Sequence, residues 1–202
     1  MTATRDPAGS DRLARQIAFI VEIDKLKQVL RQNVVTDRSR RENGAEHSWH
    51  LAAMALILSE HAAPAVDPLR VLKMLLIHDL VEIDAGDTFL YDRAAASDQA
   101  ARETAAAERL YAMLPADQAD ALKALWIEFE SGDGPDARFA RALDQLQPVL
   151  LNYHTEGGSW RAHAVRGADV LAKKRVIEHG SPTLWRFAEA LIRDSIAKGW
   201  LR

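Results

Sequence analysis

The sequence contains no cysteine, which limits the chemistry it can perform. Disulfide bonds, thiolate metal sites and a cysteine nucleophile are excluded, because each of them needs a thiol. Histidine and carboxylate side chains remain as the strong metal ligands, and they suit hard or borderline cations. Any metal site in this chain should therefore be built from nitrogen and oxygen donors.

A large excess of charge of one sign is also missing. The formal net charge is −3 over 202 residues, so neither a long nucleic acid nor an anionic membrane is indicated as a partner. A small phosphorylated ligand needs only a local cluster of positive side chains. The composition is compatible with such a ligand.

Long apolar runs are absent as well. Residues 1–10 are polar and contain no apolar signal core. The longest apolar run, Leu51–Leu58, is too short to span a bilayer. We therefore expect the protein to be cytoplasmic.

Alternating, strand-like stretches are nearly absent, whereas apolar residues recur at helical spacing along most of the chain. The pattern predicts an all-α fold with a long N-terminal helix and no boundary between two bodies, because no internal repeat or long linker is present. We predict one multi-helix domain over residues 1–202, with a flexible tail at residues 1–11. The later helices are expected near residues 45–61, 67–84, 98–113, 116–131, 136–152, 160–179 and 182–198.

The dipeptide His78-Asp79 follows an apolar stretch, residues 71–77, that should form a mostly buried helix. Burying a carboxylate is costly unless it is paired, hydrogen-bonded or bound to a metal, and a neutral imidazole is a common metal ligand. By itself the dipeptide fits either a hydrogen-bonded His-Asp pair or a metal site.

Two further residues favour the metal site. His47 opens a predicted helix, and Asp144 lies on another helix that should be mostly buried. Pro148 stands four residues after Asp144 and removes the helical donor for the Asp144 carbonyl. We therefore expect the helix to kink or loosen beside this acid.

These residues and their surroundings resemble the HD-domain 5′-nucleotidase family, of the 5′-deoxynucleotidase type. The similarity rests on the order His47, His78-Asp79, Asp144, on the run His-Asp-Leu-Val-Glu-Ile-Asp-Ala-Gly-Asp at residues 78–87, and on Arg-Glu-Asn-Gly-Ala-Glu-His at residues 41–47. It covers most of the chain. It implies a helical HD-domain bundle, often dimeric, that hydrolyses nucleoside 5′-monophosphates with the help of a divalent metal.

The resemblance would make His47, His78, Asp79 and Asp144 the ligands of one cation, with positions left open for water and a phosphate oxygen. We expect Mn²⁺, Co²⁺ or a similar ion, with Mg²⁺, Zn²⁺ and Fe²⁺ as alternatives. Binuclear members of the superfamily generally carry further histidines between the His-Asp pair and the last aspartate, whereas residues 80–153 contain none. One metal ion, and hydrolysis rather than oxygen chemistry, is therefore favoured.

Glu82 and Asp87 are the catalytic candidates. Glu82 lies four residues after His78 and three after Asp79, which places it on the same helix face as both. Its carboxylate could orient the attacking water, take its proton or protonate the leaving oxygen, while an exposed helical glutamate is the alternative. Asp87 follows Gly86. The resemblance implies that Asp87 contacts the substrate, and helix-ending turn chemistry is the alternative.

A basic cluster upstream of His47, formed by Arg31, Arg38, Arg40 and Arg41, suits phosphate binding through bidentate hydrogen bonds. The resemblance implies that an arginine at the end of the first long helix holds phosphate. Arg31 is therefore the first candidate and Arg41 the second. Residues 152–160 could line a nucleoside pocket.

The resulting hypothesis is a metal-dependent phosphohydrolase, expected to be a homodimer, that removes phosphate from nucleoside 5′-monophosphates, with deoxynucleotides as the expected substrates. Hydrolysis of another phosphate, such as a cyclic nucleotide or a guanosine polyphosphate, is one alternative. A non-catalytic helical module that senses nucleotides is another. The sequence does not identify the base or the native metal.

Overall fold

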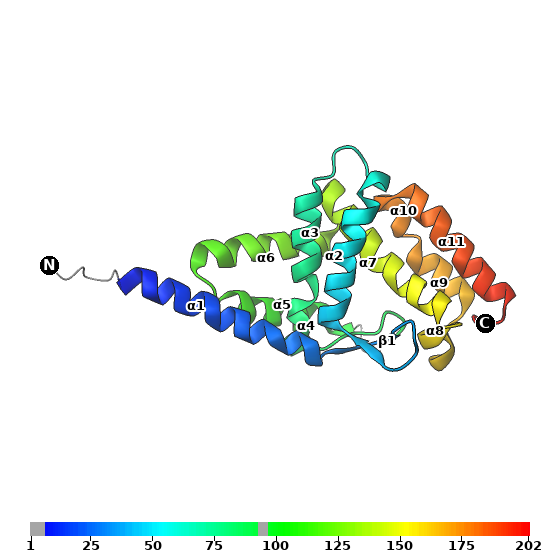
Figure 1. Cartoon of the computed structure of the whole chain (residues 1–202), viewed down its shortest axis with the longest axis horizontal. Coiled ribbons are helices and arrows are strands. Elements are labelled where there is room, and N and C mark those ends of the chain that lie inside the picture. The colour runs from blue at the N-terminus through cyan, green and yellow to red at the C-terminus, as the bar shows by residue number, and fades with distance from the viewer. Residues whose placement is uncertain (1–6, 93–96) are drawn as a thin grey trace.

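A computed structural model describes residues 7–92 and 97–202, and in these ranges the predicted all-α fold is confirmed (Figure 1). The longer helices are α1 (Pro7–Ile23), α2 (Gly44–Leu58), α3 (Pro68–Ile77), α5 (Gln99–Tyr111), α6 (Ala116–Ser131), α7 (Gly134–His154) and α11 (Pro182–Ala197). The shorter helices are α4 (Glu82–Ala85), α8 (Gly158–Ala162), α9 (Gly167–Lys174) and α10 (Ile177–Gly180), with 3₁₀ turns at η1 (Asp24–Gln28), η2 (Ser59–His61) and η3 (His78–Val81).

Helix α7 is the centre of the fold. It packs against α2, α3, α6, α10 and α11, and its side chains Leu143 and Leu146 are buried in the common core. Gly180 lets α10 approach α7 closely, because a Cβ at this position would collide with the backbone of Arg138. Around this centre, α1 projects away from the body of the molecule (Figure 1).

Side-chain caps begin two of these helices. The Asp67 carboxylate accepts hydrogen bonds from the backbone of the first turn of α3, and the Ser181 hydroxyl accepts one from the Leu184 amide of α11. Each cap precedes a proline, whose missing N–H costs nothing at the first helical position. The beginnings of α3 and α11 therefore follow directly from the dipeptides Asp67-Pro68 and Ser181-Pro182.

The structure differs from the expected helix pattern in three places. Strands β1 (Leu30–Val34) and β2 (Arg41–Asn43) form a small antiparallel sheet that alternation did not reveal, because β1 carries a polar run at its centre. The helix expected at 67–84 changes to a 3₁₀ turn at His78. The helix expected at 160–179 is divided into α8, α9 and α10, with Ala164 at a φ of 51° ending the first of them.

Two further expectations concerned a kink at Pro148 and a flexible N-terminal tail. Helix α7 continues through Pro148 without a break. Helix α1 begins at Pro7, so part of the expected tail at residues 1–11 is helical, and residues 1–6 lie outside the described residues. Within the described ranges, every helix is too short or too polar to cross a membrane.

Candidate active site

His47 is held in the first turn of α2 by a well-formed cap. The Asn43 side chain accepts a hydrogen bond from the Glu46 amide at 3.0 Å, which caps the helix, and its Nδ2 donates one to the Glu46 carboxylate at 2.6 Å. Gly44 allows this turn to lie against η1, because a Cβ there would come within 2.8 Å of the Leu26 side chain. His47 is consequently fixed with 0% of its surface exposed.

The 3₁₀ turn η3 contains Asp79 and ends one residue before Glu82, and it places the two side chains on one side. In a 3₁₀ helix, side chains three residues apart eclipse one another, so these two carboxylates align more closely than they would in an α-helix. Both face the guanidinium of Arg31, whose Nη1 lies 2.6 Å from Oδ2 of Asp79 and 3.9 Å from Oε1 of Glu82. The change of helix type thus keeps the two acids on a common face.

The four expected metal ligands lie together. Nε2 of His47 is 3.0 Å from Oδ1 of Asp144, and Nε2 of His78 is 3.7 Å from the same oxygen. Donor atoms of His47, His78 and Asp144 all lie within 4.8 Å of one another, a spacing at which they could hold a metal ion. Asp79 adjoins them, with Oδ1 at 3.0 Å from Nε2 of His78 and Oδ2 at 3.8 Å from Nε2 of His47.

The hydrogen bonds of His78 suit it to bind a cation. Nδ1 of His78 lies 3.0 Å from the Leu75 carbonyl, which can only accept, so Nδ1 carries the proton and Nε2 faces the cluster. Although Oδ1 of Asp79 is near, Nε2 is a buried atom that makes no hydrogen bond with the described residues. A backbone carbonyl that fixes the tautomer in this way is a common partner of a metal-binding imidazole.

The electrostatics of the cluster also favour a cation. Burial lowers the pKa of His78, but the carboxylates of Asp79 and Asp144 outweigh it and raise this pKa well above its usual value. Burial raises the pKa of Asp144, yet the hydrogen bond with His47 and the nearby imidazole of His78 hold this pKa well below the usual range. A field that retains an additional proton on a buried imidazole stabilises a metal ion in its place, and metal binding then releases that proton. The donor set present therefore fits a divalent cation.

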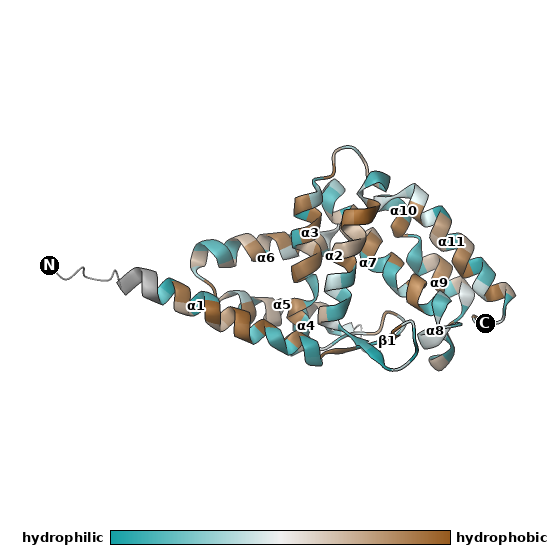
Figure 2. Cartoon of the chain, viewed as in Figure 1, coloured by the Kyte–Doolittle hydropathy of each residue, from teal (hydrophilic) through white to brown (hydrophobic). Residues whose placement is uncertain are grey.

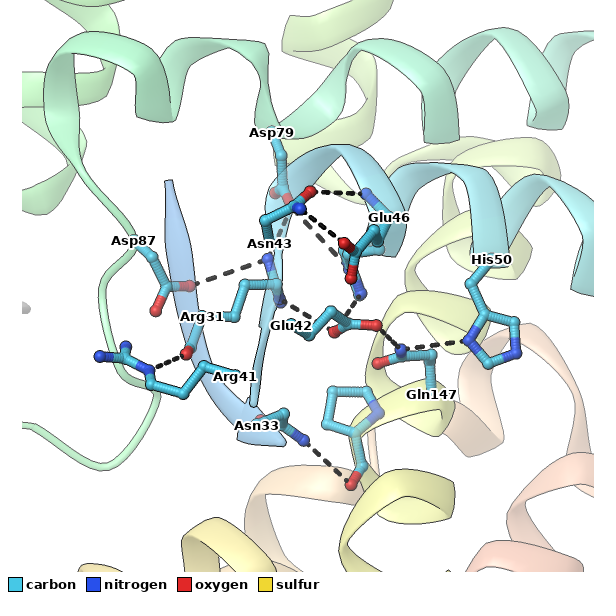
Figure 3. Close-up of polar contacts among 12 residues, drawn as sticks. Arg31, Asn33, Arg41, Glu42, Asn43, Glu46, His50, Asp79, Asp87 and Gln147 are labelled. Carbon is cyan, nitrogen blue, oxygen red and sulfur yellow. Dashed lines mark hydrogen bonds and ion pairs between the residues drawn. The ribbon is translucent and has the colours of Figure 1, made fainter. Parts of the chain in front are cut away.

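Arg31 lies among the carboxylates of Asp79, Asp87 and Glu42 (Figure 3). Besides Asp79, its guanidinium approaches Asp87 at 3.7 Å and Glu42 at 3.8 Å. Burial alone would lower the pKa of Arg31, but the neighbouring charges of Asp79 and Glu82 raise it further above its usual value. Arg31 is therefore a permanently charged group next to the expected metal position.

The other arginines of the basic cluster are engaged differently. Arg41 donates from Nε to the carbonyl of Arg31 at 2.5 Å and from Nη2 to the carbonyl of Leu30 at 3.0 Å, which braces strand β1 (Figure 3). Arg38 pairs with Glu156, and Arg40 pairs with Glu46. Of the four arginines, Arg31 is the one that lines the cavity described next.

A cavity of about 320 Å³ opens beside the expected ligands, a volume within the range of small-molecule pockets. Gly86, at a φ of 75°, turns the chain after α4 so that Asp87 joins its wall. Burial raises the pKa of Asp87, and Arg31 opposes this rise. Of residues 152–160, which were expected to line a nucleoside pocket, Asn152, Ser159 and Trp160 line this cavity. Further aromatic wall residues are Phe89, Tyr91 and Phe129.

Sequence reasoning missed Glu42 and Gln147, which lie around this site. Glu42 is buried, accepts a hydrogen bond from Gln147 at 2.6 Å, and has its Oε2 3.6 Å from Nδ1 of His47. Gln147 also lies 3.3 Å from Nδ1 of His50 (Figure 3), so His50 belongs to this outer layer. Gln147 could have been found from its position three residues after Asp144, which puts both on one helix face.

Two more missed residues, Gln145 and Lys174, are linked to Asp144 by hydrogen bonds. Gln145 donates to Oδ2 of Asp144 at 2.7 Å, and Lys174 donates to Oε1 of Gln145 at 2.8 Å. Lys174 is the last residue of α9 and only 3% exposed. A basic residue in the last turn of a helix is ordinarily explained by the helix dipole, so the sequence offered no sign that this one points inward.

Comparison with known proteins extends these observations. A family model described as HD domain matches residues 23–185. A crystal structure described as a predicted metal-dependent phosphohydrolase from Magnetospirillum magnetotacticum MS-1 is 53% identical to this chain. The superposition covers 96% of this chain and 98% of that chain, with a TM-score of 0.93.

Two curated relatives are more distant. The bovine 5′-deoxynucleotidase HDDC2 is 29% identical over 143 residues, which are 70% of this chain and 68% of that protein. The human 5′-deoxynucleotidase HDDC2 is 27% identical over 135 residues, which are 66% of this chain. The match spans 65% of the human protein's length, slightly less than two thirds.

Proposed function

The chain belongs to the HD domain family, as its resemblance predicted, and from this premise we propose that it is a metal-dependent phosphohydrolase that removes phosphate from nucleoside 5′-monophosphates. The observation that carries the proposal is the convergence of His47, His78 and Asp144 with Arg31 on the wall of the same cavity. A cation and a guanidinium in one cavity suit a phosphate group. Relatives named 5′-deoxynucleotidase support deoxynucleotides as the preferred substrates.

His47, His78, Asp79 and Asp144 would hold the metal ion. Bound there, a divalent cation supplies a Lewis acid that lowers the pKa of water and neutralises phosphate charge. Mn²⁺ or Co²⁺ suits this set of imidazole and carboxylate donors, and Mg²⁺, Zn²⁺ and Fe²⁺ are alternatives.

The remaining polar residues of the site have separate roles toward the substrate. Arg31 binds phosphate oxygens, since its planar guanidinium lines the cavity and stays charged at any working pH. Glu82, whose Oε2 is a buried oxygen that makes no hydrogen bond with the described residues, orients the attacking water or exchanges a proton with it or with the leaving oxygen. Asp87 contacts the substrate from the loop after α4. The aromatic wall accommodates the nucleoside.

A phosphate-release screen tests this function. It compares deoxyribonucleoside and ribonucleoside 5′-monophosphates with 3′-monophosphates, cyclic nucleotides and guanosine polyphosphates, each in the presence of Mn²⁺, Co²⁺ and Mg²⁺. We expect release from the 5′-monophosphates, with the deoxy forms preferred. Preferential hydrolysis of a cyclic nucleotide or a polyphosphate would replace the proposed substrate, and binding of nucleotides without any release would show a sensor.

We also propose that the protein is a homodimer in the cytoplasm. Leu13, Ile17 and Val21 on the projecting helix α1 are at least half exposed, and Trp49 on α2 is 69% exposed; the apolar colouring of α1 is visible in Figure 2. Exposed apolar side chains gathered on one helix are typical of an association surface. Light scattering of the wild type and of an Ile17→Glu, Val21→Glu double variant tests the dimer, and the variant is expected to be monomeric.

A further inference from the structure

The two carboxylate oxygens of Asp144 face different partners. Oδ1 lies 3.0 Å from Nε2 of His47 and 3.7 Å from Nε2 of His78, which places it in the proposed metal cluster. Oδ2 accepts a hydrogen bond from Nε2 of Gln145 at 2.7 Å. One oxygen is therefore directed at the metal position, and the other is held away from it.

Lys174 determines which way the Gln145 amide points. An ammonium group can only donate, so its contact with Gln145 at 2.8 Å must be with the amide oxygen. The amide NH₂ is then left to donate to Asp144. Without Lys174 the amide could turn over and present its oxygen to the carboxylate, which would repel Asp144 instead of holding it.

The backbone around Asp144 gives a reason for such a support. Pro148 has no N–H, so the Asp144 carbonyl lacks the donor that the next turn of helix α7 would otherwise provide. Lys174, at the end of α9, extends to the Gln145 side chain and has only 3% of its surface exposed. Burying an ammonium group is unfavourable. Here the hydrogen-bond acceptor is a neutral amide, which does not neutralise the charge, so burying Lys174 costs folding free energy that an exposed lysine does not cost.

We infer that Lys174 and Gln145 are positioning residues, which act in series to hold Asp144 with one oxygen directed at the metal ion. The inference rests on the proposed function, because it assumes that the cluster binds a divalent cation. Outer hydrogen-bond partners of metal ligands typically change metal affinity 10- to 100-fold when they are removed. Lys174 and Gln145 should have an effect of this kind without touching the metal.

The sign of the effect separates positioning from simple charge. Lys174 is positive, so if it acted only through space its removal would relieve repulsion of the cation and tighten metal binding. If it acts through Gln145, its removal loosens Asp144 and weakens metal binding. The two explanations therefore predict opposite changes in affinity for the same variant.

The experiment measures Mn²⁺ affinity by competition with a metal-binding indicator dye, on metal-free protein and without any nucleotide. The variants are Lys174→Met, Gln145→Leu and the double variant, with Lys174→Arg as the conservative replacement. Arg175→Met is the matched control, because Arg175 is the next basic residue in the chain but is exposed and pairs with Glu178. Circular dichroism and the melting temperature of each metal-free variant establish that it is folded.

We expect Lys174→Met and Gln145→Leu each to weaken Mn²⁺ binding roughly 10-fold. The double variant should bind Mn²⁺ no more weakly than the single variant with the lower affinity, because the effects of two residues that act in series are not additive. Lys174→Arg should recover most of the affinity, and Arg175→Met should leave it unchanged. Tighter or unchanged Mn²⁺ binding by Lys174→Met, or by Gln145→Leu if Lys174→Met does not fold, would overturn the inference.

The same measurement distinguishes this inference from the proposed function. If the wild type binds no Mn²⁺ and hydrolyses nucleotides without metal, the proposed metal site is wrong and the inference is overturned with it. If the wild type binds Mn²⁺ and the variants bind it equally well, the positioning role alone is overturned. Metal binding with weakened variants supports the inference whichever phosphate ester the enzyme prefers.

Discussion

Nε2 of His47 and Oδ1 of Asp144 lie 3.0 Å apart, although 97 residues separate the two in the sequence. The contact joins α2 to α7, helices that also pack against each other through apolar side chains. A metal ion held by both residues would link the same two helices. Binding of the metal should therefore stabilise the fold as well as create the active site.

The first prediction concerns removal of the metal. Treatment with a chelator should abolish phosphate release, and Mn²⁺ or Co²⁺ should restore it. Because a ligand that binds only the folded state adds to its stability, a metal concentration 100 times the dissociation constant should raise the free energy of unfolding by about 3 kcal/mol. Calorimetry and a phosphate assay on the same samples measure both effects. Full activity in a sample shown to be metal-free would contradict the central proposal.

The second prediction concerns Asp144. Asp144→Asn keeps the size of the side chain but removes its charge, so Mn²⁺ affinity should fall by at least roughly 10-fold, the scale found when only an outer partner of a ligand is lost. His50→Gln is the control, because His50 contacts Gln147 outside the cluster and its replacement should leave most of the affinity. Unchanged metal content and rate in Asp144→Asn would remove this residue from the ligand set.

Two of the proposed metal ligands could be singled out from the sequence because their signals are local, whereas the full set of four was implied by the resemblance to the HD-domain family. A carboxylate in an apolar helix, as at Asp79 and Asp144, requires compensation wherever the chain folds. The helical periodicity also placed most helices correctly, since each must bury one apolar face. What the sequence could not supply was the distance between segments, which depends on how α2, α3 and α7 pack.

The outer residues illustrate this limit. Lys174 and Arg175 are neighbouring basic residues at the end of α9, yet Lys174 is buried against Gln145 while Arg175 is exposed. Neither composition nor spacing in the sequence distinguishes the buried residue from the exposed one. Strand β1 escaped prediction for a related reason: its pairing with β2 and the hydrogen bonds of Arg41 to its carbonyls are tertiary contacts, which the polar sequence of β1 does not reveal.

The third prediction separates the two candidate phosphate ligands. Arg31→Ala should raise KM and lower kcat. A contact to phosphate that is present in the bound substrate and tightens in the transition state contributes both to substrate binding and to the rate of turnover. Arg31→Lys, which keeps the charge, should lose less. Arg41→Ala should chiefly lower stability, by about 1 kcal/mol, because Arg41 donates to backbone carbonyls of β1. If Arg41→Ala alone changes KM, Arg41 is the phosphate ligand, and if neither does, phosphate is held elsewhere.

The fourth prediction concerns pH. Burial lowers the pKa of Lys174 from 10.5 to about 8, against the opposing charge of Asp144 and with support from Arg31 and Lys173. Between pH 8 and pH 10.5, Lys174 is protonated in the unfolded chain but mostly neutral in the folded protein. The free energy of unfolding therefore rises with pH over this range, by up to roughly 3 kcal/mol. Denaturation of metal-free protein from pH 7 to pH 10 should show the wild type gaining stability relative to Lys174→Met. Parallel profiles would contradict this pKa.

Glu82 should be separable from metal binding. It lies in α4, three residues after the proposed ligand Asp79, and its Oε1 is 3.9 Å from Nη1 of Arg31, on the cavity wall. Burial, followed by the charge of Asp79, raises the pKa of Glu82 well above its usual value. A carboxyl group that retains a proton unusually well is suited to proton transfer, provided that it is not itself needed to hold the metal.

The fifth prediction tests this separation with Glu82→Gln, which preserves size and hydrogen bonding but cannot readily accept a proton. We expect a folded protein with wild-type metal content and nucleotide affinity, whose single-turnover rate falls by roughly 10²-fold or more, the usual scale of general acid–base catalysis. Asp84→Asn is the control, because Asp84 belongs to the same short helix but pairs with Arg109 and should leave the rate unchanged. Loss of metal from Glu82→Gln would make Glu82 a ligand or a support of one. A near-normal rate would mean that another group orients the water or transfers the proton.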